Sequence, residues 1–414
     1  MIKEILKTQN KHNKVISGSL LWGYFAIVIF MIGSGLEQAF LSKQLLEFGF
    51  LANQTAAIFT AYGVSVAISA WLAAILSEII GTRKVMFLGT TSWIIFQIGF
   101  ILFGIIPGNY GMILLLYGLR GFSFPLFVYA FISFLTQVTP TKQLPTAMGG
   151  FWFAYSLGLG VIGSYLPSFT IPKIGYVGTL WLAIVFVLVG GMVGIIGLKD
   201  VSIKIHNQYT TKKYSMTPFK DSLTILFRKP KIFLAAIVKM INQLAANGYV
   251  IAMPIFLTSH KIGFTMSEWL QIWGLMYLVN IAFNLIWGMV ANHLPWHRVV
   301  EWFGCVGMAL ACVLFYYVPY LYGPNLIAMF GVAALFGAAL AAFTPISAIF
   351  VALAPEETGA AMSIHNLAGG LSQFVGYGVT GVLLSLFDTA GFVWSMAGIY
   401  LIGAVCAHFL AAED

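Results

Sequence analysis

Long apolar runs separated by short polar gaps dominate this chain of 414 residues. About 20 mainly apolar residues are enough to cross a bilayer as a helix, and only 8% of the residues are charged, against roughly 25% in soluble domains. A membrane β-barrel is excluded because its strands alternate apolar and polar residues over about 10 positions. The pattern predicts an all-α membrane protein with twelve transmembrane helices, near 19–42, 53–77, 85–106, 111–138, 144–169, 176–198, 231–258, 268–291, 298–319, 323–352, 358–386 and 391–411.

Lys and Arg are distributed unequally between the two sides that these runs define. The gaps on one side contain only Lys43, Lys173 and Lys261, and the other basic residues outside the runs lie on the opposite side. Because Lys and Arg accumulate in cytoplasmic loops, we expect both termini in the cytoplasm and the protein in the cell (inner or plasma) membrane. The net charge of +8 then reports orientation, and no nucleic-acid partner is expected.

The chain reads as two similar halves around one polar stretch. Glu78, Arg83 and Lys84 follow the second run, and Asn292 and Arg298 occupy matching places after the eighth. We expect these residues to gate the inner side. Parallel halves are typical of transporters with a central substrate site. The predicted parts are a cytoplasmic N-terminal segment 1–18, a six-helix bundle 19–198, a cytoplasmic central loop 199–230 and a pseudo-symmetric six-helix bundle 231–414.

Three charged residues, Glu37, Arg120 and Lys239, lie inside the apolar runs and away from their ends. Such a charge costs at least about 2.5–3.5 kcal/mol unless a partner or water relieves it, and it marks a candidate functional site. Glu37 and Arg120 lie roughly 8 and 14 Å below the outer ends of their helices, close enough for an extended arginine to bridge. They are either a fixed ion pair or a proton-coupling pair. For Lys239 we expect the ammonium to reach toward the cytoplasmic interface.

A stripe of amides and aromatic rings marks the eighth run. Trp273, Tyr277, Asn280 and Asn284 recur at i, i+4, i+7 and i+11, so they share one helix face. Amides donate to and accept from hydroxyl groups, and rings cover a carbon backbone. The stripe therefore indicates a polyhydroxylated ligand, or else helix-to-helix packing through asparagine. Both interpretations apply to the other candidates for the substrate site, Gln38, Phe124, Trp152, Tyr155, Asn242, Gln243, Asn247, Asn366 and Gln373.

Short motifs resemble those of a known transporter family. The loop after the second run keeps Gly81, Arg83 and Lys84 of a signature that reads approximately Gly-x-x-x-Asp-Arg-x-Gly-Arg-Lys. In this loop the sequence resembles the major facilitator superfamily. Further segments are similar to its polyol permease branch, bacterial carriers of pentitols such as ribitol and arabinitol. These segments are Gly35-Leu-Glu37-Gln38, Arg120-Gly-Phe-Ser-Phe-Pro125, Ile241-Asn242-Gln243, Glu268-Trp-Leu-Gln-Ile-Trp273 and Asn366-Leu-Ala-Gly-Gly370. Two positions depart from the pattern, Ser34 where an acidic residue is expected and Lys239 where Arg is expected.

The resemblance implies a secondary transporter that imports a linear sugar alcohol by proton symport and alternating access. It assigns proton coupling to Glu37 and Arg120. Uptake of a small organic acid, with Arg120 and Lys239 as anion ligands, is the alternative; efflux is disfavoured because the run 158–163 lacks the Gly-Pro pair of drug antiporters. We expect no enzyme activity, cofactor or metal, and a monomer in the lipid bilayer. His365, beside Asn366, is expected to be a hydrogen-bonded structural residue.

Overall fold

The computed structural model describes residues 20–139, 144–198, 224–291 and 293–411. Throughout this part the chain is helical, without a strand. This follows from the long apolar runs, since a backbone in lipid must satisfy its hydrogen bonds within the segment. The predicted N-terminal segment 1–18 and most of the central loop lie outside the described residues.

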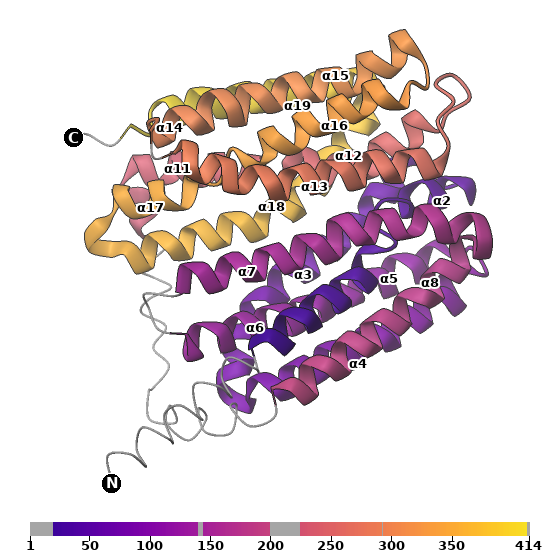
Figure 1. Cartoon of the computed structure of the whole chain (residues 1–414). Coiled ribbons are helices and arrows are strands. Elements are labelled where there is room, and N and C mark those ends of the chain that lie inside the picture. The colour runs from indigo at the N-terminus through magenta and orange to yellow at the C-terminus, as the bar shows by residue number, and fades with distance from the viewer. Residues whose placement is uncertain (1–19, 140–143, 199–223, 292, 412–414) are drawn as a thin grey trace. The chain divides into compact units, whose positions relative to one another are not determined.

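Contacts within the chain define two units. The first comprises residues up to Glu37 and the stretch Val64–Lys213. Its elements are the helix Leu20–Gly35, α4 (Thr82–Gly99), the π-helical segment η1 (Phe100–Ile105), α5 (Tyr110–Arg120), α6 (Ser123–Val138), α7 (Leu144–Ser156), the π-helical segment η2 (Leu157–Ile162) and α8 (Gly163–Gly197). Within it, α4 lies beside α6 and α8 (Figure 1).

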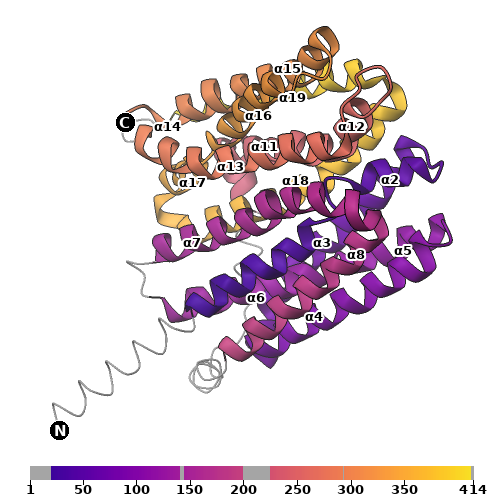
Figure 2. The ribbon, with the colours of Figure 1, turned by 45° about the vertical axis from the view of Figure 1, so that its right-hand side comes forward.

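The second unit comprises Gln38–Gly63 and the stretch from Tyr214 onward, so the boundary falls inside α3 (Ala52–Ile80). The other elements are α2 (Leu41–Glu47), α11 (Pro230–Asn242), α12 (Leu244–Leu257), α13 (Met266–Val290), α14 (Trp296–Arg298), the π-helical segment η3 (Val299–Val306), α15 (Gly307–Tyr322), α16 (Leu326–Ala341), α17 (Ile346–Leu353), η4 (Pro355–Glu357), α18 (Thr358–Leu386) and α19 (Thr389–His408). Here α11 and α12 both pack along α18, and α13 packs along α16 (Figure 2). The predicted bundle boundaries stay a prediction.

Among the described residues, nine helices of 18 or more residues are apolar enough to cross a bilayer, and Leu20–Gly35 is a shorter apolar helix. The helical stretch Ala147–Gly197 has 51 residues, more than twice the length that one span needs. Its backbone is kinked at Gly175, where φ is +72°, a conformation that glycine adopts readily. The stretch therefore contains two of the predicted runs. An all-α membrane fold is confirmed, and the total of twelve spans stays a prediction.

Two of the runs that read as continuous helices are broken beside their charged residues. The first ends at Gly35, and Glu37 lies in the turn that precedes α2. The fourth divides into α5, which ends at Arg120, and α6. Pro125 accounts for this second break, because a proline ring clashes with the carbonyl four residues earlier, here that of Gly121. Both charged residues thus lie where the backbone leaves regular helix. The two breaks are buried in protein, and burial is one of the conditions under which non-helical backbone is tolerated at membrane depth.

The seventh run is interrupted at Gln243, between α11 and α12. The hydroxyl of Tyr400, on α19, fills the gap: it donates to the carbonyl of Asn242 (2.9 Å) and accepts from the amide of Ala245 (3.2 Å). A side chain inserted into the helical ladder is a recognised cause of a kink. A Cβ on Gly248, in α12, would lie 2.4 Å from Thr380 Oγ1, so this glycine allows close packing against α18.

Candidate functional site

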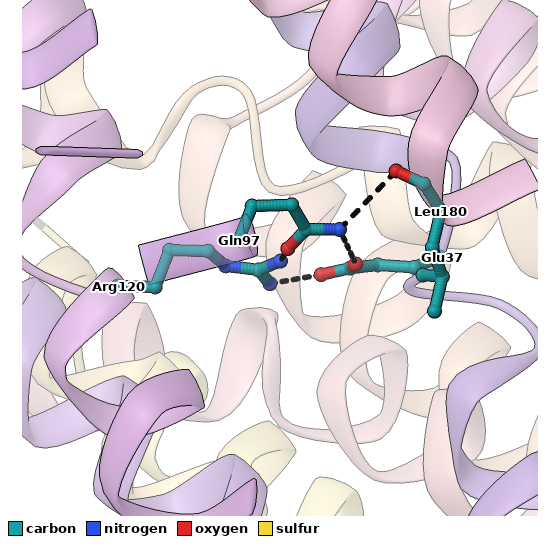
Figure 3. Close-up of polar contacts among 4 residues, drawn as sticks. All are labelled: Glu37, Gln97, Arg120 and Leu180. Atoms are coloured by element: carbon teal, nitrogen blue, oxygen red, sulfur yellow. Dashed lines mark hydrogen bonds and ion pairs between the residues drawn. The ribbon is translucent and has the colours of Figure 1, made fainter. Parts of the chain in front are cut away.

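Glu37, Gln97 and Arg120 form a closed polar ring in the first unit (Figure 3). The guanidinium of Arg120 donates through Nη2 to Glu37 Oε1 and through Nη1 to Gln97 Oε1. The amide of Gln97 donates to the other carboxylate oxygen, Glu37 Oε2 (3.2 Å), and to the backbone oxygen of Leu180 on α8 (3.5 Å). Side chains from α4 and α5 therefore donate to the Glu37 carboxylate, and α8 holds the Gln97 amide in place.

The ring is closed to solvent and lined by aromatic side chains. Glu37 and Gln97 are fully buried, and Arg120 is 1% exposed. The guanidinium carbon lies 4.5 Å from the ring centre of Tyr117, 5.0 Å from that of Trp93 and 5.6 Å from that of Phe100. Aromatic faces attract a guanidinium by about 0.5–2 kcal/mol each, so this surrounding holds the cation in place without offering it a second carboxylate.

The contact between Glu37 and Arg120 was expected from the sequence, whereas Gln97 was missed. Gln97 lies inside the run 85–106, and an amide within an apolar run was the available signal. The sequence could not show which neighbouring helix the Gln97 side chain faces, because the position of a residue along a helix does not identify the helix packed against it. In the structure this residue is the one that contacts both members of the ion pair.

The amide stripe on α13 is engaged between helices. Asn280 donates to the carbonyl of Gly337 on α16 (3.3 Å), Asn284 donates to Asn280 Oδ1 (3.3 Å), and Thr344 donates to Asn284 Oδ1 (2.7 Å). The backbones approach so closely here that a Cβ on Gly337 would lie 2.2 Å from the oxygen of Met276. These contacts match the packing interpretation of the two asparagines, and their role in binding stays a prediction.

The aromatic members of the stripe pack edge-on to each other, and Trp273 also stacks on Trp269. Trp273 is 2% exposed, and its ring centre lies 5.1 Å from that of Trp269 and 6.0 Å from that of Tyr277. At the start of α13 the side chain of Thr265 accepts from the amide of Glu268, and the Glu268 carboxylate accepts from the amide of Thr265. This capping box satisfies helix-end donors, which gives the Glu268 of the motif a structural role.

The candidates on α11, α12 and α18 are brought close together. Asn247 donates to the carbonyl of Ser372 on α18 (3.2 Å), and one residue further on Gln373 donates to the hydroxyl of Tyr377 (3.2 Å). Asn242 is 6% exposed, and its Oδ1 is buried with no hydrogen-bond partner among the described residues. A buried acceptor without a donor costs about 1–3 kcal/mol, so Asn242 is the amide here with capacity left for a ligand hydroxyl.

The remaining predicted residues are dispersed. Phe124, on α6, is 5% exposed, whereas Trp152, on α7, is 47% exposed and packs edge-on to the ring of Tyr155. Gln38 is half-buried in the turn before α2, and Asn366 is exposed on α18 beside His365, with 3.2 Å between Asn366 Oδ1 and His365 Nδ1.

The predicted gating residues lie at helix starts. Arg83 and Lys84 open α4 after Gly81, and Arg298 ends α14; none of the three forms an ion pair within the described part of the chain. The side chain of Glu78 and the whole of Asn292 lie outside the described residues. Their gating role stays a prediction.

Comparison with known proteins decides the family. The family model described as "Major Facilitator Superfamily" matches residues 20–322 and 236–414, which together cover nearly the whole chain. The chain belongs to the Major Facilitator Superfamily. It is therefore a multi-pass membrane transporter and not an enzyme, as the sequence predicted.

Relatives within this superfamily are similar over almost their full lengths. The D-arabinitol and ribitol transporters of Klebsiella pneumoniae are each 40% identical, over 96% and 99% of this chain and 93% and 96% of the relatives. An alpha-ketoglutarate permease of Bacillus subtilis (strain 168) is 37% identical over 98% of this chain and 92% of its own. The fold is similar to the crystal structure of the nucleoside transporter NupG, with a TM-score of 0.73, 13% identity, and coverage of 97% of this chain and 100% of that one.

Proposed function

We propose that this carrier imports a linear sugar alcohol, a pentitol such as ribitol, arabinitol or xylitol, together with a proton. The observation that carries the proposal is the buried ring of Glu37, Gln97 and Arg120. The substrate class is supported by the two relatives named for D-arabinitol and ribitol. Alternating access between two halves is the mechanism expected of this superfamily.

The ring can couple proton binding to conformation through electrostatics. A nearby guanidinium favours the ionised carboxylate, and burial favours the protonated one. In the present conformation Arg120 donates to Glu37 Oε1, and the proposed cycle starts from this ion pair. A rearrangement that draws Arg120 away leaves a buried charge without its partner, an arrangement that costs about 3–5 kcal/mol. Uptake of a proton by Glu37 removes that cost, so the substrate-loaded carrier changes conformation only after the proton is bound, and the empty carrier returns after the proton is released.

Gln97 serves the carboxylate in either protonation state. Its Nε2 donates to the ionised Glu37 in the present conformation. After Arg120 withdraws, Gln97 Oε1 is free to accept from a protonated Glu37 once the amide has rotated, because an amide offers a donor and an acceptor on adjacent atoms. Gln97 is thus a positioning residue of the coupling site, and it keeps Glu37 hydrogen-bonded throughout the cycle.

The proton gradient makes uphill uptake of a neutral solute feasible. One elementary charge moving through about 100 mV releases about 2.3 kcal/mol, which corresponds to roughly 50-fold accumulation. In the proposed carrier the amides and rings of the predicted substrate residues contact the polyol, and the termini are cytoplasmic in the cell membrane. A monomer suffices for this mechanism.

A competition assay tests the substrate class. Protein in proteoliposomes is expected to exchange labelled ribitol, and unlabelled pentitols are expected to inhibit that exchange. Thermal stability of the purified protein should rise with the same ligands, since a ligand that binds only the folded state stabilises it. Inhibition by alpha-ketoglutarate and not by pentitols would contradict the polyol proposal and favour the organic-acid alternative, to which the alpha-ketoglutarate permease points.

A further inference from the structure

Lys239 is a cation inside the membrane-spanning stretch Pro230–Leu257. None of the ion pairs within the described part of the chain includes it. The acidic side chains of the other described spans are engaged: Glu37 binds Arg120, Glu268 caps α13, and Glu301 lies 3.1 Å from His408. An isolated charge at this depth is costly and marks a functional site unless it reaches water.

The side chain of Lys239 does not extend toward the inner end of its helix. Arg228 and Glu357 form a two-bond ion pair, 2.9 and 3.2 Å, which holds the starts of α11 and α18 together. Lys239 lies roughly 14 Å along α11 from Pro230, and Gly369 lies roughly 16 Å along α18 from Thr358. A Cβ on Gly369 would be 3.4 Å from Lys239 Cε. The methylene stem therefore crosses sideways to α18, and the expected reach to the cytoplasmic interface does not describe it.

Polar groups of two helices surround this position. His365 lies one turn before Gly369 on α18 and is the neighbour with which the Lys239 charge interacts. Its imidazole contacts Asn366 Oδ1 (3.2 Å) and packs edge-on to Phe350. On α11, Asn242 follows Lys239 at i+3, on the same side of the helix, and carries the buried Oδ1 that has no partner among the described residues. A lysine and an asparagine with an available acceptor thus occupy positions one helical turn apart on α11.

We propose that Lys239 and Asn242 form an anion subsite, through which the carrier accepts polyhydroxy carboxylates as well as linear polyols. The carboxylate would bind the Lys239 ammonium, and a neighbouring hydroxyl would donate to Asn242 Oδ1. The Lys239 stem lies against α18 at Gly369, and this sideways course argues against a lipid phosphate as the partner of the ammonium. This proposal rests on the proposed function in one respect: the anion subsite adjoins the amides of the second unit that are proposed to bind the polyol.

The test compares two probes that differ at a single carbon. Ribitol ends in CH₂OH where ribonate ends in a carboxylate, and both are used to inhibit exchange of labelled ribitol in proteoliposomes. The readout is the ratio of the half-inhibiting concentrations of ribonate and ribitol. Ribonate is expected to inhibit the unmodified protein. Lys239→Met is expected to raise this ratio about tenfold or more, because ribonate loses one hydrogen bond to a charged group. Lys239→Arg keeps the positive charge and is expected to bring the ratio back close to that of the unmodified protein.

Controls separate the subsite from general damage. Lys261→Met removes an exposed lysine near Tyr320 and should leave the ratio unchanged. Liposomes with and without anionic lipid should give the same ratio, and a Lys239→Met effect seen only with anionic lipid would assign Lys239 to lipid and overturn the proposal. The proposal is also overturned if ribonate fails to inhibit ribitol exchange, or if the ratio is equal in Lys239→Met and the unmodified protein. If the unmodified protein exchanges no pentitol, the proposed function fails, and ribonate-dependent thermal stabilisation in the two proteins still decides the subsite.

Discussion

At the scale of single residues, the proposed proton coupling requires Glu37 to be stable with and without its charge. A buried carboxylate is normally either permanently ionised beside a cation or permanently protonated in an apolar pocket. Here Arg120 supplies the cation and Gln97 supplies an amide that contacts both groups, while three aromatic rings surround the guanidinium. The polar ring of Glu37, Gln97 and Arg120 therefore contains the groups that the proposed change of Glu37 between its ionised and protonated forms requires.

Gln97→Leu should weaken both folding and coupling. The leucine is similar in size, but Glu37 Oε2 and Arg120 Nη1 lose their amide partner, and a buried group without its partner costs about 1–3 kcal/mol. We expect a lower melting temperature in detergent and a smaller uphill accumulation of ribitol relative to exchange. Gln271→Leu is the matched control, because the half-buried Gln271 makes one long contact, 3.4 Å to Ser267 Oγ. An uphill-to-exchange ratio equal to that of the unmodified protein would show that Gln97 has no part in coupling.

How far the sequence predicts this site depends on whether each residue has a unique partner. Glu37 and Arg120 are opposite charges in a medium that penalises both, so their contact could be predicted from depth alone. Asn280 and Asn284 bear amides that suit a ligand and a neighbouring helix equally well, and in the structure they bond to Gly337 and Thr344. Periodicity fixes the face on which an amide lies, but it does not say what that face contacts.

At the scale of elements, the broken helix of α11 and α12 depends on one hydroxyl. Tyr400 is fully buried and bridges the carbonyl of Asn242 and the amide of Ala245. Without water at this depth the two backbone groups have no alternative partner. The break places Asn242 and Gln243 at the end of a helical segment, where a small change of backbone angle displaces both side chains.

Tyr400→Phe should destabilise the protein through this break. It keeps the ring and removes only the hydroxyl, so we expect a loss of about 1–3 kcal/mol and weaker ribitol binding, since Asn242 loses its backbone anchor. Tyr322→Phe, at a side chain 71% exposed, is expected to change neither. Thermal melting with and without ribitol gives both quantities. Equal melting curves for Tyr400→Phe and the unmodified protein would mean that the break needs no bridge.

Close helix packing in the first unit depends on glycine at a few positions. A Cβ on Gly190, in α8, would lie 2.4 Å from the backbone nitrogen of Phe30, which has no freedom to move aside. Gly190→Ala should therefore lower the melting temperature, by a free energy of about 1–3 kcal/mol. Gly331→Ala, in α16, has no atom within 4 Å of the new Cβ and should stabilise slightly because alanine favours helix. The account of packing is wrong if both variants melt alike.

The sequence predicts elements better than it predicts their interruptions. Apolar length alone predicts an all-helical membrane fold, because every backbone bond in lipid has to be made within the helix. The break before α6 was also readable, since Pro125 excludes a regular helix there. The break at Gln243 was not, because its cause is a tyrosine more than 150 residues away.

At the scale of the whole molecule, the chain divides its chemistry between the two units. The first holds the buried ring of Glu37, Gln97 and Arg120, and the second holds the amides of α11, α12 and α18 together with Lys239. In a carrier that alternates between two arrangements, a ligand shifts the equilibrium only by its difference in affinity for them. In the proposed mechanism, proton and polyol act on different units of one two-state system.

The central claim is that the proton on Glu37 drives uptake, and uphill transport by Glu37→Gln tests it most directly. Proteoliposomes with an imposed pH gradient are measured for ribitol accumulation above equilibrium and, without a gradient, for ribitol exchange. The glutamine imitates the protonated carboxyl and cannot release a proton. We predict that the unmodified protein accumulates ribitol, and that Glu37→Gln exchanges ribitol but accumulates none. Accumulation by Glu37→Gln equal to that of the unmodified protein would contradict the account.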